Sequence, residues 1–133
     1  MSKKNLNKQI PEISCAISIV FEQDVEVDEI VSSLKGMGIS EIDVCRPKCE
    51  PLVSLDIAIV KNERFWYLDD ALTKMFSKIN AIEHLKEIVS EYGGAFCIDI
   101  VFYQYGTYPA LEFIGDNMKK IRFLEADISI DAY

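Results

Sequence analysis

ISCAISIVF, residues 13–21, alternates an apolar position with a smaller or more polar one along its whole length. Successive side chains of a strand point to opposite faces of a sheet, so a period of two predicts a strand with one apolar face. That face consists of Ile13, Cys15, Ile17, Ile19 and Phe21. The other face is small and partly polar, which indicates that only one side of this strand lies on the core.

The same alternation recurs at residues 52–60, 96–103 and 126–133, and more weakly at 39–44. In the 52–60 segment, Asp56 lies between Ser54 and Ala58 on the second face, which favours a wet face or a position near a sheet edge. We expect an exposed edge near Leu52 to Val60. The chain therefore has strands enough for one sheet.

The segments between these strands have the periodicity of helices. Apolar residues at helical intervals predict helices over residues 26–34 and 116–124, and between 69 and 92 either one kinked helix or two consecutive ones that break at Asn80. We expect Asp69 or Asp70 to cap the middle helix and Asp116 to cap the last one. Strands interleaved with helices predict an α+β fold, with an antiparallel or mixed sheet and helices packed on one face. The predicted domain covers residues 12–133, after a flexible arm at residues 1–11.

Composition restricts the class of partner. The 133 residues include 22 Asp and Glu against 14 Lys and Arg, a formal net charge of −8. A field of this sign repels phosphate backbones, so we expect no direct nucleic-acid partner and favour a basic protein. No apolar run reaches the roughly 20 residues of a membrane span, and no apolar stretch follows the lysines of the first ten residues, so we expect no signal peptide and a cytoplasmic location.

Residues suited to catalysis or metal binding are sparse. His84, the single histidine, falls at the boundary of a helical stripe, and the thiols Cys45 and Cys49 flank two cations without a second pair to complete a metal site. Cys15 and Cys97 fit core or near-core positions. No phosphate-binding glycine loop and no nucleophile motif occurs. We therefore expect no enzyme, no cofactor and no metal.

Aromatic and acidic residues offer the better candidates for contact with a partner. Phe65-Trp66-Tyr67 places three rings in a row, and they cannot all point inward, so at least one is expected to meet solvent or a partner. A second aromatic group surrounds a glycine–proline loop. The predicted partner-binding residues are Glu63, Trp66, Tyr67, Asp69, Asp70, Tyr105 and Tyr108.

The C-terminal two-fifths of the chain resembles the bacterial family called domain of unknown function 4279. The resemblance is carried by Leu85-Lys86-Glu87-Ile88, by Glu91-Tyr92-Gly93-Gly94, by the strand from Ile98 to Tyr103, and by the ending from Leu124 to Tyr133. Between residues 39 and 51 the chain departs from the family's pattern. The resemblance implies a compact α+β domain and no known active site.

Small, acidic, cytoplasmic domains of this kind are similar to immunity proteins that neutralise nuclease toxins. A nuclease holds phosphates with Lys and Arg, so an inhibitor rich in carboxylates can be steered to that basic surface and cover it. The sequence therefore favours an acidic protein-binding inhibitor, and the most specific hypothesis is an immunity protein. The alternative is a non-catalytic structural or self-associating module, for instance a homodimer through the sheet edge near Leu52 to Val60.

Overall fold

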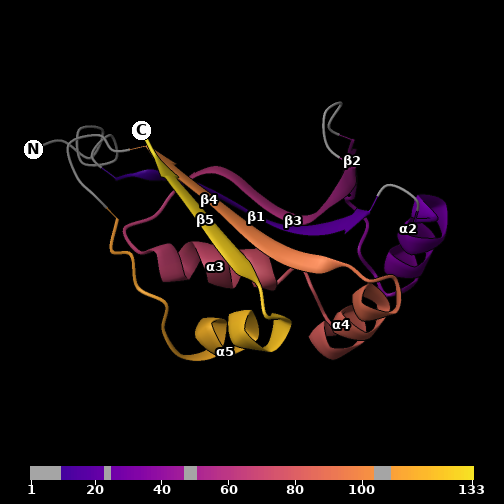
Figure 1. Cartoon of the computed structure of the whole chain (residues 1–133). Helices are drawn as coiled ribbons and strands as arrows, with labels where there is room; N and C mark the ends of the chain where they lie inside the picture. The colour runs from indigo at the N-terminus through magenta and orange to yellow at the C-terminus, as the bar shows by residue number, and fades with distance from the viewer. Residues whose placement is uncertain (1–9, 23–24, 47–50, 104–108) are drawn as a thin grey trace, which may run out of the picture.

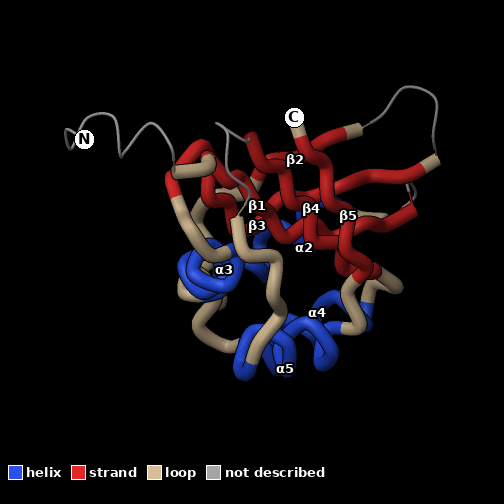
Figure 2. The backbone as a smooth tube through the Cα atoms, turned by 90° about the vertical axis from the view of Figure 1, so that its left-hand side faces the viewer, coloured by secondary structure: helices blue, strands red, loops and turns tan. Residues whose placement is uncertain are grey.

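The computed structural model describes residues 10–22, 25–46, 51–103 and 109–133. Five strands form one sheet in the order β2-β3-β1-β4-β5. Of the four helices of the described part, the last three lie below the sheet and the first lies beside its end (Figures 1 and 2). The α+β class, the mixed sheet and the packing of helices on one face are confirmed. The strands are β1 (Glu12–Glu22), β2 (Asp43–Cys45), β3 (Leu52–Arg64), β4 (Ala95–Tyr103) and β5 (Asp127–Ala132).

The central strand is β1, the alternating segment of the sequence. It pairs antiparallel with β3 on one side and with β4 on the other, and its five predicted inward residues are all 2% exposed or less. Fully burying an aliphatic or aromatic side chain of this size contributes about 1.5–3 kcal/mol, so this strand alone fixes which face of the sheet the helices cover.

The helices are α2 (Val27–Gly36), α3 (Leu68–Phe76), α4 (Ile82–Glu91) and α5 (Gly115–Leu124). The break at Asn80 is confirmed, and it separates two helices rather than kinking one. The predicted caps are wrong: Tyr67 and Ile114 occupy the N-cap positions, so Asp69, Asp70 and Asp116 lie in the first turns. Carboxylates there still favour helix formation through the helix dipole.

The two edges of the sheet differ from the expectation. Residues 54–56 of β3 pair with β2, so the predicted exposed edge near Leu52 to Val60 is wrong for that stretch. At the opposite edge β5 pairs in parallel with β4 and with no other strand of the described residues. A register shift between Ile17 and Ser18 lets β3 bulge against β1 at the centre of the sheet.

Candidate interaction surface

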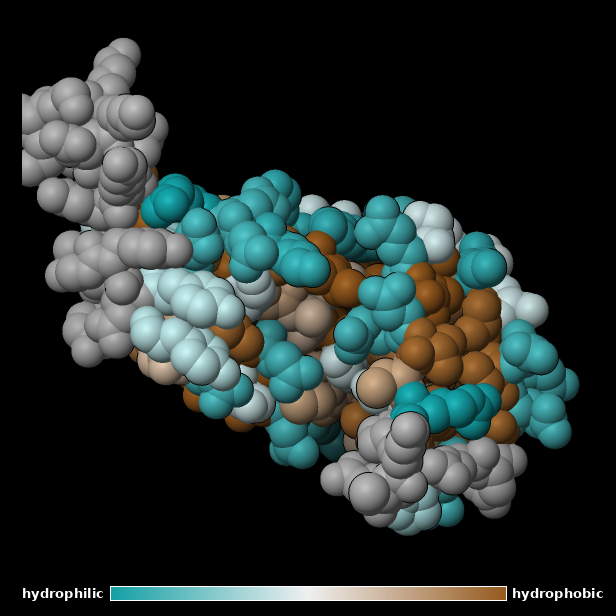
Figure 3. All heavy atoms as spheres, turned by 90° about the horizontal axis from the view of Figure 1, so that it is seen from above, coloured by the Kyte–Doolittle hydropathy of each residue, from teal (hydrophilic) through white to brown (hydrophobic). Residues whose placement is uncertain are grey.

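No described element covers the sheet face turned away from the helices, and Figure 3 shows hydrophilic and hydrophobic residues interspersed on it. Residues paired across strands direct their side chains to the same face. The strand registers join one residue of every strand in a single row, from β2 to β5: Asp43, Asp56, Ser18, Cys97 and Asp127. Three of the five are aspartates, so the row brings together negative charges that lie far apart in the sequence.

Ser18 lies at the centre of this row and is only 4% exposed. Its Oγ donates to Asp56 Oδ1 at 2.6 Å and lies 3.3 Å from Asp99 Oδ2. A hydroxyl carries one proton, so it donates fully to only one carboxylate at a time. The result is a pair of aspartates held on either side of one buried hydroxyl.

We call Asp43, Asp56, Asp99, Asp127 and Asp131 the acidic face. Asp131 belongs to it because it pairs with Val101, two residues along β4 from Asp99. The ion pairs of the described residues lie elsewhere and leave these five carboxylates without a cation. Three of the five line a shallow hollow of about 460 Å³, together with Lys61 and Tyr103. Asp43 stands directly opposite Asp56, an arrangement of like charges that costs stability.

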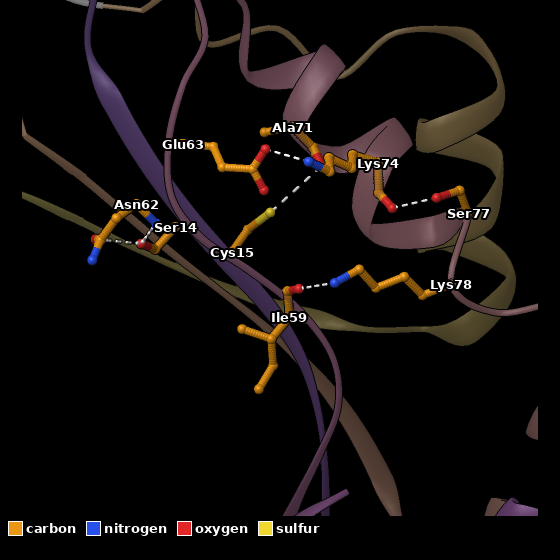
Figure 4. Close-up of polar contacts among 9 residues, drawn as sticks. All are labelled: Ser14, Cys15, Ile59, Asn62, Glu63, Ala71, Lys74, Ser77 and Lys78. Carbon is orange, nitrogen blue, oxygen red and sulfur yellow. Dashed lines mark hydrogen bonds and ion pairs between the residues drawn. The ribbon is translucent and has the colours of Figure 1, made fainter. Parts of the chain in front are cut away.

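Two of the thiols, Cys97 on this face and Cys15 on the other, are poor nucleophiles. Burial raises the pKa of Cys97, and the neighbouring Asp99 and Asp127 carboxylates raise that pKa further. On the other face of the sheet, burial raises the pKa of Cys15 to about 12, and its Sγ points to the carbonyl of Ala71 (Figure 4). A thiolate is the reactive form of cysteine, so both residues stay protonated and unreactive near neutral pH.

Metal binding finds no support in the described ranges, which contain no group of three or more potential ligands. His84 is exposed on α4, 3.7 Å from Glu87 of the same helix, and has no contact with the acidic face. Cys45 is exposed in β2, and Cys49 lies outside the described residues.

The aromatic part of the predicted site is exposed as expected. Trp66 is 42% exposed and Tyr67 is 58% exposed, so the prediction that at least one ring of this run meets solvent is confirmed. Their backbone is fixed, because Trp66 O accepts from Ala110 N at 2.8 Å and Tyr67 forms an isolated parallel bridge with Ala110. Tyr105 and Tyr108 lie outside the described residues.

Two of the three predicted acidic residues are engaged inside the molecule. Glu63 forms an ion pair with Lys74 of α3 (Figure 4), and Asp69 Oδ1 accepts from Asn117 Nδ2 at 2.9 Å. Asp70 is exposed in the first turn of α3 and is available to a partner.

The acidic face as a set is not apparent from the sequence. The alternation around Asp56 predicts a wet face, but nothing local in the sequence relates Asp56 to Asp43 or Asp127. Only the pairing of five strands does so. The alternation of aspartate with isoleucine at residues 127–131 was the one local signal.

No family model, curated protein or solved structure matches this chain. None of the helices in the described part has the length and apolar character needed to cross a bilayer.

Proposed function

We propose that this chain is a non-catalytic binding protein that neutralises a basic partner protein in the cytoplasm. In its most specific version, the protein is an immunity protein that covers the basic surface of a toxin domain. A nuclease is the toxin that fits best, because its phosphate-binding surface is basic. The resemblance to the domain of unknown function 4279 family is compatible with this proposal, because it implies a compact domain without a known active site.

The supporting observation is the acidic face. It presents five aspartates on an uncovered sheet, none of them neutralised by a cation of the described residues. A pair of like charges directly opposed across two strands lowers stability, and proteins carry such local costs most often where a surface has a function. A basic surface laid on this face would remove the repulsion and gain attraction in one step.

The first test is the neighbouring gene. An exported protein with a variable C-terminal domain encoded immediately upstream would supply the partner, and we expect that domain to be basic. Its production in a host cell should arrest growth, and co-production of this chain should restore it. A neighbourhood without such a gene, or a toxin whose arrest this chain leaves unchanged, would contradict the immunity form of the proposal.

The surface is tested with matched charge reversals. Asp43→Lys/Asp99→Lys changes the acidic face, and Asp28→Lys/Glu29→Lys makes the same change of charge on the exposed start of α2. We expect the first variant to weaken binding at least 100-fold, mainly through slower association, and the second to weaken it less than tenfold. Binding kinetics at two salt concentrations give the measurement. Equal losses in both variants, or an affinity independent of salt, would contradict a role for this face.

The alternative function is a structural or self-associating module. The observation that favours it is the outer edge of β5, which no described element covers. Light scattering across a range of concentrations separates the two proposals, because a binding protein of this charge is expected to stay monomeric.

A further inference from the structure

The outer edge of β5 is unpaired along its whole length in the described structure. The strand has β4 on one side and no described element on the other, and all six of its residues are exposed (Figures 1 and 2). An unpaired edge presents a row of backbone donors and acceptors to any extended segment that can reach it.

The hydrogen-bond pattern identifies the backbone groups that point outward. Tyr133 N donates to Phe102 O at 3.0 Å, so the N–H and C=O groups of Tyr133 point toward β4. These groups alternate in direction from one residue to the next along a strand. The backbone groups of Ile128, Ile130 and Ala132 therefore point to the open edge.

The opposite edge of the sheet is protected in a way that β5 is not. The edge strand there is β2, which has only three residues, and a short edge strand offers little backbone to an added strand. Beyond the end of β2, Lys78 Nζ donates to Ile59 O of β3 (Figure 4). A lysine placed on an edge carbonyl is a common protection against strand addition. Strand addition is therefore directed to β5.

The side chains of β5 define what can be added. Ile128 and Ile130 pair with Ile98 and Ile100 on the helix side of the sheet, yet remain 39% and 42% exposed. Asp127 and Asp131 belong to the acidic face on the other side. An added strand thus meets two apolar side chains on one face and two carboxylates on the other.

A second copy of this chain fits that pattern poorly. In the antiparallel self-pairing that sets Ser129 opposite Ser129, the isoleucines of the two copies meet, but Asp127 of one copy stands opposite Asp131 of the other. Like charges directly opposed are destabilising, and each copy carries a net charge of −8. Charge complementarity instead favours a basic strand.

We propose that β5 accepts an extended segment of the basic partner by strand addition. The segment has the five-residue pattern basic–apolar–any–apolar–basic, with its basic residues opposite Asp127 and Asp131 and its apolar residues opposite Ile128 and Ile130. The pattern reads the same in both directions, so it holds for either strand polarity. This inference rests on the proposed function for the basic nature of the partner and adds the place and mode of its attachment.

The test uses the full chain and a synthetic β-hairpin whose outer strand reads Lys-Val-Thr-Val-Lys. Amide hydrogen exchange, followed by NMR, should slow at least tenfold at Ile128, Ile130 and Ala132 when the hairpin is added. The amides of Ser129 and Asp131 already face β4 and should change little. Docking by side chains alone would not produce this alternation.

Two controls isolate the backbone and the charges. A hairpin N-methylated on its outer strand cannot donate to β5 and should give no protection. Asp127→Lys/Asp131→Lys should lower the affinity for the lysine hairpin at least tenfold. The same variant should bind a hairpin that carries glutamate in both lysine positions. Asp28→Lys/Glu29→Lys should leave the affinity for the lysine hairpin unchanged.

Three outcomes would overturn the inference: uniform or absent protection along β5, equal protection by the N-methylated hairpin, and a dimer joined through β5 without any peptide. If the partner protein binds in a manner sensitive to Asp43→Lys/Asp99→Lys while β5 amides stay unprotected, strand addition fails and the proposed function stands. If the hairpin protects β5 but no basic partner is neutralised, the proposed function fails.

Discussion

Asn117 joins two helices through one buried amide. It is 4% exposed, and its Nδ2 lies within 3.0 Å of three oxygens on α3: the Asp69 carbonyl, Asp69 Oδ1 and Thr73 Oγ1. The contact explains why Asp69 is less suited to partner binding than Asp70. Its carboxylate already accepts from α5, so a substitution there would disturb the fold before it revealed a binding role.

Removal of this amide should destabilise the protein. We expect Asn117→Ala to lower the free energy of unfolding by about 1–3 kcal/mol, because the oxygens of Asp69 and Thr73 lose their buried donor. Asn80→Ala, at an exposed position, serves as the control and should change stability by no more than about 0.5 kcal/mol. Urea denaturation measures both. Equal effects of the two variants would contradict a role for Asn117 in holding α5 to α3.

At the scale of elements, the end of α4 depends on close packing against β1. A Cβ added to Gly94 would lie 2.4 Å from Phe21 Cε1 and 2.8 Å from Val89 Cγ1. Both distances are shorter than van der Waals contact, so the neighbouring side chains would have to move. The tandem glycines at residues 93 and 94 follow the end of α4 at Glu91. The structure adds that Gly94 is required because the ring of Phe21 occupies the space of a side chain.

Gly94→Ala should therefore be destabilising by about 1–3 kcal/mol, the usual cost of forcing extra volume into a packed region. The matched variant is Gly36→Ala at the last position of α2, where an added Cβ meets nothing within 4 Å. There alanine should stabilise by up to about 1 kcal/mol, because it restricts the unfolded chain. Thermal unfolding of the two variants should show shifts of opposite sign, and a neutral Gly94→Ala would refute the packing argument.

At the scale of the whole molecule, the acidic face favours binding of a basic partner but lowers the stability of the fold. The five aspartates of the acidic face have no ion pair within the described part of the chain, so they repel one another, and the net charge of −8 adds to that repulsion at low ionic strength. If this surface serves a basic partner, substitutions that remove its charge should weaken binding and at the same time raise the free energy of unfolding.

We expect Asp43→Asn/Asp99→Asn to raise the free energy of unfolding by up to about 1 kcal/mol at low salt, and this gain to shrink at about 0.5 M salt. Asp28→Asn/Glu29→Gln removes the same charge from the first turn of α2, where carboxylates favour the helix dipole, and should slightly lower stability. Denaturation at two salt concentrations measures both variants. A loss of stability in the first would show that these aspartates serve the fold.

Much of the fold could be predicted from the sequence because its signals are local. The period of two in residues 13–21 identified the strand that lies at the centre of the sheet, and apolar spacing identified the helices. Capping was predicted wrongly at Asp69, Asp70 and Asp116, because acidic residues are favoured in the first turn of a helix as well as at its cap. Backbone geometry places the N-cap at Tyr67 and Ile114 instead.

The sequence by itself determined an acidic α+β chain with one apolar face per strand, since charge and alternation are properties of neighbouring residues. Tertiary structure alone decided that Asp43, Asp56 and Asp127 share one row and that β5, rather than the 54–56 stretch of β3, is left open. Strand order and register arise from pairing between distant segments. A strand's own pattern shows which face it buries, but not which strand it lies beside.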